Sequence, residues 1–377
     1  MASGPRNTRA IDRLADAAQR GDDLVTFWRT VAPTLGRVVP HFETPCFFTV
    51  DPGSLLITSH FQEGLPEIPA EWLAREYTAP DYNSLAAVFA SPDGLGTLYD
   101  ATGGRPELAT KYHEEMVPYG CEQELVLALR TRDEELWGAV GLYREPGQPL
   151  FSHADKAFLR AAAPILAEGA RRGLLYGEAV EPDLPDAPGA VVLTADLRVA
   201  SYTDSALPLL AALGGSPADL PAALTAVAGA GLAATEHEDR TEAQARTRTL
   251  GGEWLVLHAS PLMDGNGGDR RVLVILEQAQ PSRVAPLLMS AYQLTPRERD
   301  VAALALAGHS TSECAARLSI AEYTVQQHLQ RIFDKTGVRS RRELTSRVFG
   351  SHYEPRVRDN EARTEDERSA RGGPMPA

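Results

Sequence analysis

The chain has 377 residues, a net charge of −14 and three cysteines, Cys46, Cys121 and Cys314. The length allows two or three domains with hydrophobic cores, and the cysteines, which form no close pair, exclude a disulfide framework and a zinc site of the usual spacing. Because the N-terminus lacks the apolar core of a signal peptide and no apolar run approaches the length of a membrane span, we expect a cytoplasmic protein with no membrane partner.

The first 175 residues alternate between helical and strand patterns. Apolar residues recur at helical spacing in some segments and form short runs bounded by turn residues in others. In chain order we expect two helices between residues 11 and 39, strands at 46–50 and 55–59, short helices at 72–77, 82–89 and 107–116, strands at 125–130 and 136–143, and a long helix from 153 to 175. This order predicts an α+β domain.

A core strand of this region runs into the long helix through Phe151, Asp155 and Leu159. This pattern resembles the end of a GAF domain, and we place a GAF-like sensor domain at residues 22–178, after an N-terminal helical segment at residues 1–21. The resemblance implies a fold that binds a small molecule or another protein. Since the cyclic-nucleotide signature of some GAF domains is absent, the resemblance does not name the ligand.

A second α+β unit is expected after a linker at 179–189, which is rich in proline and acidic residues. The expected elements are strands at 190–194 and 197–201, helices at 204–213 and 220–234, and strands at 243–250, 253–260 and 271–277, with a flexible loop at 264–269. Two strands, helices and then three strands resemble the order of a PAS domain. We therefore place a PAS-like domain at residues 190–280.

Charge separates the C-terminal segment from the rest of the chain. Residues 290–349 hold nine Lys and Arg against six Asp and Glu, whereas residues 1–289 hold 23 against 39. DNA repels an acidic surface, so only the C-terminal segment is suited to contact a polyanion.

A repeated sequence pattern marks the predicted helix starts in the C-terminal segment. Thr295, Ser310 and Ser340 are each followed three residues later by glutamate and then by an apolar periodic run. This capping-box pattern predicts a small all-helical unit, in which Gly308 and Gly337 lie where helices end.

The third helix of this unit, from about Glu322, has two different faces. Val325, Leu329 and Ile332 share the apolar face. The opposite face carries Tyr323, Gln327, Gln330, Arg331 and Asp334, with Thr324 and Gln326 on its flanks. With the short helix at 311–318 before it, this is the pattern of a helix-turn-helix whose second helix reads base edges, although an ordinary four-helix bundle with a solvated face has the same periodicity.

This segment resembles the LuxR-type helix-turn-helix domain of bacterial transcription regulators, and we place that domain at residues 281–350. The matching positions are Leu294 to Arg299, Val301, Gly308, Ala315, Ala316, Leu318, Thr324, Val325, His328, Leu329, Ile332, Lys335, Gly337, Val338, Ser340 and Arg341. The resemblance implies base contacts from Gln326, Gln327 and Gln330. It implies phosphate contacts from Thr324, Lys335 and Arg341, and we add Arg331 and Ser340 to the predicted DNA-binding residues.

The segment departs from the family pattern at three positions. Ala321 stands where the family usually has a serine cap, which costs about 1 kcal/mol of helix stability. Tyr323 and Gln326 stand where the family favours lysine. Fewer cations release fewer counterions from DNA, so we expect a shallower salt dependence than is usual for the family and a recognition sequence of the protein's own.

We therefore predict a multidomain fold with α+β GAF-like and PAS-like domains, a C-terminal all-α LuxR-type domain and a disordered tail at 351–377. The predicted function is sequence-specific binding of double-stranded DNA by a homodimer that regulates transcription. An unidentified small molecule is expected as effector and RNA polymerase as a further partner. We expect no catalytic residue, no metal and no cofactor.

Other functions compete with this prediction. The front domains could be a sensor enzyme, or the C-terminal helices could bind a protein instead of DNA. In a phosphorelay receiver, Asp22 and Asp23 would form the acidic pair and Asp51 the phosphate acceptor. However, a receiver's acidic pair follows an apolar strand, and here it follows a helical stretch, so we interpret Asp51-Pro52-Gly53 as a turn. We find no match to an acyl-homoserine-lactone sensor and no catalytic motif.

Overall fold

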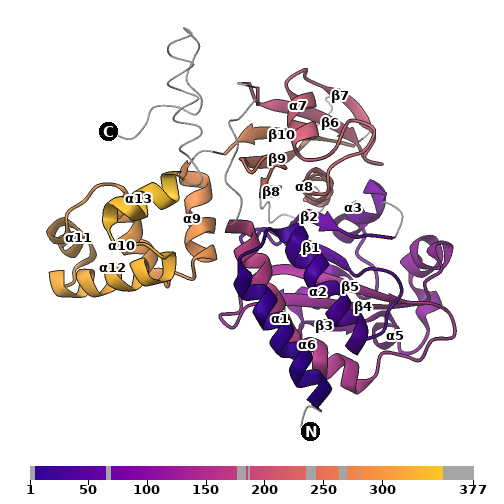
Figure 1. Cartoon of the computed structure of the whole chain (residues 1–377). Helices are drawn as coiled ribbons and strands as arrows, with labels where there is room; N and C mark the ends of the chain where they lie inside the picture. Colours follow the sequence, from indigo (N-terminus) through magenta and orange to yellow (C-terminus); the bar gives the residue numbers. More distant parts are fainter. Residues whose placement is uncertain are drawn as a thin grey trace. The chain divides into compact units, whose positions relative to one another are not determined.

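The computed structural model describes residues 5–64, 69–175, 184–185, 187–234, 243–262, 270–279 and 281–350 (Figure 1). The chain divides into two compact units, one formed by residues 1–176, 188–247 and 257–276 and the other by residues 177–187, 248–256 and 277–377. The predicted tail at 351–377, the predicted loop at 264–269 and most of the predicted linker at 179–189 lie outside the described residues. No helix among the described residues is long and apolar enough to span a membrane.

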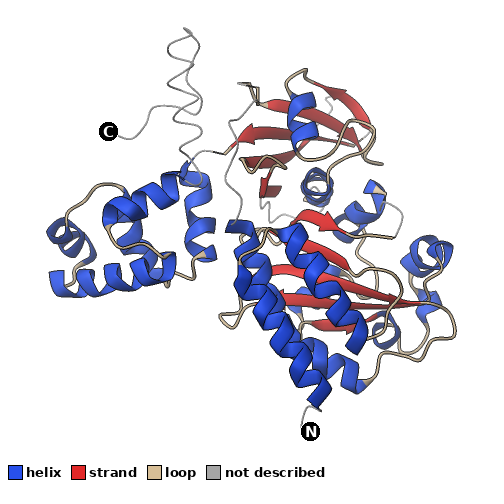
Figure 2. Ribbon diagram, in the orientation of Figure 1, coloured by secondary structure: helices blue, strands red, loops and turns tan. Residues whose placement is uncertain are grey.

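The first sheet has five strands in the order β2-β1-β5-β4-β3, and neighbouring strands run antiparallel (Figure 2). The strands are β1 (Cys46–Val50), β2 (Ile57–Phe61), β3 (Leu95–Thr97), β4 (Gln123–Arg130) and β5 (Leu136–Arg144). The predicted strands and the predicted hairpin between β4 and β5 are confirmed, with β2 two residues later than expected. We did not expect β3, because a three-residue strand with a glycine at its centre is too short to show a period.

Three helices pack together on one face of this sheet: α1 (Pro5–Arg20), α2 (Leu24–Val38) and α6 (His153–Leu175) (Figure 1). Trp28 of α2 stacks on Phe47 of β1 with ring centroids 4.4 Å apart. A Cβ at Gly169 of α6 would lie 2.0 Å from the Phe27 ring, so only glycine lets α6 approach α2 this closely. These contacts form the core on the helical side of the sheet.

Short helices cover the other face: α3 (Ala70–Thr78), α4 (Leu85–Ala90), α5 (Leu98–Ala101), and the 3-10 and π turns at Pro106–Leu108, Tyr112–Met116 and Val117–Tyr119. The helical segment predicted at 107–116 is interrupted at Ala109, with a 3-10 turn before it and a π-helical turn after it. The backbone is extended at Ala109, and the Lys111 N–H donates to Asp81 Oδ2 at 2.9 Å instead of to a helical carbonyl. These short pieces bring polar side chains over the sheet.

The second sheet has the order β7-β6-β10-β9-β8, which repeats the arrangement of the first. Its elements are β6 (Gly189–Thr194), β7 (Val199–Tyr202), α7 (Ala206–Ala212), α8 (Ala222–Ala233), β8 (Ala243–Arg248), β9 (Trp254–Leu262) and β10 (Arg271–Gln278), each close to the predicted span. α8 is apolar on all sides and largely buried. It lies beside α3, where a Cβ at Gly229 would be 3.1 Å from the Ala74 carbonyl oxygen.

Asp51, at the end of β1, forms a buried ion pair with Arg246 of β8. Its carboxylate accepts hydrogen bonds from Arg246 N (2.9 Å), Nε (2.8 Å) and Nη2 (2.5 Å), and its side chain is 2% exposed. Nearby, Thr247 Oγ1 donates to the Thr58 carbonyl at 3.0 Å. A carboxylate held in this way is not presented to a phosphoryl donor, which removes the receiver interpretation of Asp51.

The C-terminal helices are α9 (Pro281–Ala291), α10 (Pro296–Leu306), α11 (Thr311–Leu318), α12 (Glu322–Thr336) and α13 (Arg341–Gly350). The capping boxes at Thr295 and Ser310 are complete. At the third box, Ser340 Oγ accepts from Glu343 N as predicted, but the Glu343 carboxylate accepts from Arg339 N instead of Ser340 N. We did not predict α9 as a helix, since its sequence contains two prolines.

Candidate DNA-binding surface and small-molecule cavity

α12 is held by an apolar face that is fully inside its domain. Val325 and Ile332 are 0% exposed and Leu329 is 5% exposed. The helix before it ends at Ser319, which adopts a left-handed conformation (φ 54°), and α12 ends at Gly337 in the same conformation. The side chain of Ala321 provides no cap, as predicted. Because the buried stripe fixes the rotation of α12, the opposite face points to solvent.

The exposed face of α12 carries the predicted base-reading residues. Gln326, Gln327, Gln330 and Arg331 are all exposed, and Tyr323 is 69% exposed. Within this face Gln330 Nε2 donates to Asp334 Oδ1 at 3.0 Å. Amides offer both donors and acceptors, so this face has the groups that can pair with base edges in a major groove.

Three residues predicted to contact DNA also bond inside the domain. Lys335 Nζ donates to Glu298 Oε2 and to the Gln293 carbonyl, both at 2.7 Å. Arg341 donates to the His309 carbonyl at 2.5 Å and to Thr311 Oγ1 at 3.0 Å, and Ser340 caps α13. Their roles at DNA stay predictions, and Lys335 and Arg341 each also join two elements of the domain.

Glu298 is buried at the start of α10 beneath Lys335, with 3% of its side chain exposed. Burial raises the pKa of this carboxyl, but the hydrogen bonds from Lys335 and Thr295 outweigh burial and hold the pKa below its ordinary value. The ion pair therefore ties α12 to α10.

A cavity of about 120 Å³ lies on the short-helix side of the first sheet. Alternate residues of a strand face opposite sides of a sheet, so Phe48 lines this cavity while Phe47 packs against α2. Trp72 and Leu73 of α3 and Tyr143 of β5 add to an apolar and aromatic wall. The cavity is therefore built from the sheet and from the irregular segment above it.

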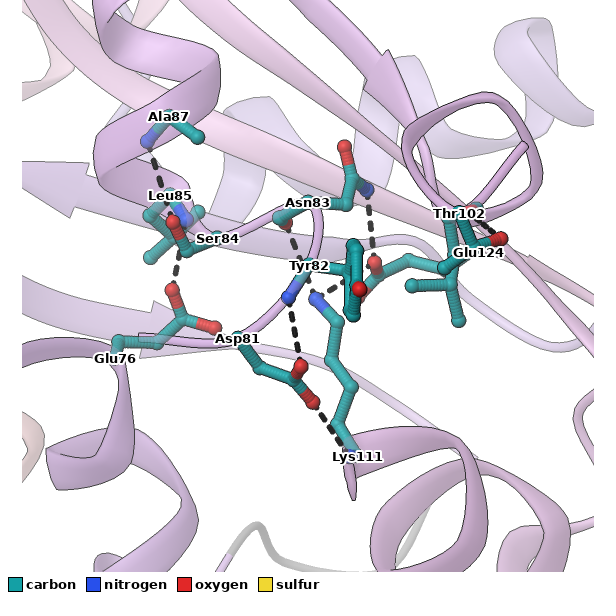
Figure 3. Close-up of polar contacts among 11 residues, drawn as sticks. Glu76, Asp81, Tyr82, Asn83, Ser84, Leu85, Ala87, Thr102, Lys111 and Glu124 are labelled. Carbon is teal, nitrogen blue, oxygen red and sulfur yellow. Dashed lines mark hydrogen bonds and ion pairs between the residues drawn. The ribbon is translucent and has the colours of Figure 1, made fainter. Parts of the chain in front are cut away.

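One end of the cavity holds a buried polar cluster (Figure 3). Lys111 Nζ lies 2.8 Å from Glu124 Oε2 and donates to the Asn83 carbonyl at 3.1 Å. The same Glu124 oxygen accepts from Asn83 Nδ2 at 2.8 Å. Both charged side chains are less than 10% exposed. The ion pair is thus fixed by Asn83, a residue whose backbone has a positive φ of 55°.

Two further carboxyls line the cavity. Glu76 of α3 accepts from Leu85 N at 2.7 Å, and Glu115 contacts Arg75 Nη1 at 3.2 Å. Burial raises the pKa of both, that of Glu115 to about 7. Sequence reasoning missed these residues, because the cluster gathers single polar residues from positions 76 to 124 with no local spacing.

A family model described as bacterial regulatory proteins, luxR family, matches residues 292–348. Residues 292–348 are a LuxR-type DNA-binding domain. The resemblance drawn from the C-terminal sequence is therefore confirmed for this segment.

No curated protein matches the chain. Similar solved structures include the VqmA dimer of Vibrio cholerae without target DNA, a LuxR-type receptor, with 20% identity, coverage of 28% of this chain and 54% of that chain, and a TM-score of 0.16. The V. cholerae VqmA–ligand–DNA complex has 15% identity, coverage of 46% and 85%, and a TM-score of 0.22. Bacteriophytochrome RpBphP3 of R. palustris has 11% identity, coverage of 74% and 63%, and a TM-score of 0.32. The chain thus spans about half the length of the first VqmA structure that it matches. At these TM-scores the similarity does not indicate a function.

Outside the LuxR-type domain, His60 and His113 have ordinary surroundings. His60 stacks on Phe48 with ring centroids 4.7 Å apart, and His113 Nε2 bonds the Glu107 carbonyl at 2.9 Å. Among the described residues, no group of three His, Cys, Asp or Glu side chains is arranged to hold a metal ion.

We expect Cys46 and Cys121, which both line the cavity, to be unreactive in the folded protein. Burial raises the pKa of Cys46 to about 12 and that of Cys121 to about 11, so little thiolate exists at pH 8. Iodoacetamide labelling, followed by peptide mass spectrometry, should be at least about 100-fold slower for both than in urea-unfolded protein. Fast labelling of Cys121 in the folded state would contradict this expectation.

Proposed function

We propose that the protein is a homodimeric, sequence-specific regulator in which α12 lies in the major groove of DNA. Gln326, Gln327 and Gln330 read base edges, and Arg331 and Thr324 contact the backbone. The observation that supports this most strongly is the exposed amide face of α12, set by a stripe that is fully buried, inside a LuxR-type domain. One helix-turn-helix contacts little DNA, so a dimer on two half-sites about one turn apart would supply the affinity.

The two α+β domains, each built on one of the two sheets, would supply the input to this regulator. We assign the first sheet and its helices to a GAF-like domain and the second to a PAS-like domain. Their shared strand order, with the first and last strands adjacent, supports a common sensor architecture. The cavity beside the first sheet is the place for a small-molecule effector. Such an effector can act only by binding the DNA-competent and DNA-incompetent states of the protein with different affinity. We assign no enzymatic activity to the chain, and RNA polymerase is the further partner of such a regulator.

The base-reading role of α12 is tested with single glutamine variants. Selection of bound genomic fragments first gives the operator and its half-site spacing. Gln327→Ala and Gln330→Ala should then each weaken operator binding by about 1–3 kcal/mol at one base position, because a bidentate contact to that base is lost. Fluorescence anisotropy against operators with single base changes, at several salt concentrations, measures this loss.

Two controls separate readout from other roles. Gln19→Ala changes an exposed glutamine of α1 and should leave binding intact. The salt slope of Gln327→Ala should equal that of the wild type, whereas Arg331→Ala should lower the slope by about 1. If Arg331→Ala binds every duplex as the wild type does and no operator is selected, the groove placement of α12 is wrong.

A further inference from the structure

The polar end of the cavity carries excess negative charge. Glu76, Glu115 and Glu124 line it, against Lys111 alone. Arg75, which is outside the lining, contacts Glu115 but also Glu114 at 2.7 Å, so its charge is shared by two carboxylates. Lys111 is already paired with Glu124. An anionic ligand would therefore meet carboxylates with no free cation to receive it.

Each carboxylate in this cluster is engaged through one of its two oxygens. Glu76 Oε2 accepts from Leu85 N, Glu115 Oε1 contacts Arg75, and Glu124 Oε2 contacts Lys111 and Asn83. Carboxylate oxygens accept and do not donate when ionised, so they call for a donor from the ligand. An ammonium group supplies several donors and a compensating charge.

The pKa of Lys111 also reflects the negative charge at this end of the cavity. Burial by itself lowers the pKa of a lysine, yet here Glu124 and Glu76 raise the pKa of Lys111 above its ordinary value. The carboxylates thus favour a charged ammonium at this end of the cavity in spite of burial.

The rest of the cavity wall suits an apolar body. Phe48, Trp72, Leu73, Met116 and Tyr143 lie around it. Aromatic faces attract cations in addition to packing against apolar groups. The wall and the polar end together define a ligand with one cationic and one apolar part.

We propose that this cavity binds a small organic cation, a primary amine carried on an apolar or aromatic body, with its ammonium group against Glu76, Glu115 and Glu124. The proposal names the chemistry of the effector in the proposed function. Binding to the cavity is measured without DNA, so its failure is distinct from a failure of α12 to read DNA.

Three matched probes test the charge preference on the full-length protein: phenethylamine, 2-phenylethanol and phenylacetate, which share one aromatic body. Isothermal titration calorimetry at pH 8 and quenching of tryptophan fluorescence measure binding. We expect phenethylamine to bind at least about tenfold more tightly than either other probe, since a desolvated charge pair adds more than 1.4 kcal/mol. Binding of phenylacetate as tight as that of phenethylamine, or no binding of phenethylamine at millimolar concentration, overturns the proposal.

Conservative variants locate the amine. Glu115→Gln and Glu76→Gln keep the shape of each side chain but remove its charge, and each should reduce the preference for phenethylamine over 2-phenylethanol by about tenfold. Glu114→Gln is the control, because Glu114 also pairs with Arg75 but does not line the cavity. Circular dichroism confirms that each variant is folded. An equal effect of Glu114→Gln would show that the amine binds outside the cavity.

The affinity should also depend on pH with a defined sign. The charged groups that face Glu115 are Arg75 and Glu76 of α3, Lys111, and Glu124 of β4. With a pKa of about 7, Glu115 goes from about one-tenth to nine-tenths ionised between pH 6 and pH 8, so phenethylamine should bind up to about tenfold more tightly at pH 8. The Glu115→Gln variant should lose this dependence. Tighter binding at pH 6 than at pH 8 contradicts the proposal.

Discussion

The Asp51→Ala variant is expected to lose about 3–5 kcal/mol of unfolding free energy, because it breaks a buried ion pair and removes the carboxylate to which Arg246 and Gly53 donate. Asp51 accepts three hydrogen bonds from Arg246, one of them from the backbone, and a fourth from Gly53 N at 2.9 Å. Urea unfolding followed by tryptophan fluorescence measures the change. The loss should fall on the unit that contains both sheets, since the pair joins β1 to β8 across 195 residues of sequence.

A surface ion pair provides the matched control for Asp51. Arg29 and Glu63 lie 2.7 Å apart, with side chains 60% and 47% exposed. Glu63→Ala should therefore cost less than about 1 kcal/mol. The double variant Asp51→Ala, Arg246→Met should be more stable than Asp51→Ala alone, because it also removes the buried charge of Arg246. Equal losses for Asp51→Ala and Glu63→Ala would mean that the buried pair contributes nothing to the fold.

The helix α12 could be predicted because its signals are local. The caps at Thr295 and Ser310 and the 3.6-residue period of Val325, Leu329 and Ile332 all lie within single helices. The amide face follows from the same period without any knowledge of the partner helices. For the same reason the long strands β4 and β5 and the long helix α6 were predicted, whereas α9 was hidden by prolines that lie within it.

The cavity could not be predicted, since its polar end depends on long-range packing. Asn83 reaches Glu124 only because the chain turns at a residue with positive φ, and Gly96 leaves room for the Asn83 side chain, where a Cβ would lie 2.1 Å from Oδ1. Lys111 sits in a segment whose helical pattern breaks. Sequence periodicity does not report contacts between residues that are far apart in the chain. The ion pair between Asp51 and Arg246 could not be predicted for the same reason.

The Lys335→Met variant is expected to destabilise the LuxR-type domain by about 2–3 kcal/mol, because the buried Glu298 then loses its counter-charge. The cost is smaller than for a fully buried pair, since the Lys335 side chain is 34% exposed and solvent screens its charge. Thermal or urea unfolding measures the change. Adding Glu298→Gln should restore part of the loss, because glutamine still has an oxygen to accept from Thr295 N but carries no charge.

The pH dependence of this variant should reverse in sign. In the wild type the pKa of Glu298 is below its ordinary value of 4.5, so its contribution to stability is complete above that value and is lost as pH falls through the lowered pKa. Without Lys335, burial raises the pKa instead, so the deficit of Lys335→Met should be largest near pH 7 and shrink towards pH 4. A deficit that is constant with pH would show that Glu298 is not the group responsible.

A contact between Lys335 and a DNA phosphate is tested in the Glu298→Gln background, by measuring how DNA binding depends on salt. If Lys335→Met lowers the salt slope by about 1, Lys335 is a phosphate contact as well. If the slope is unchanged, Lys335 has the structural role alone.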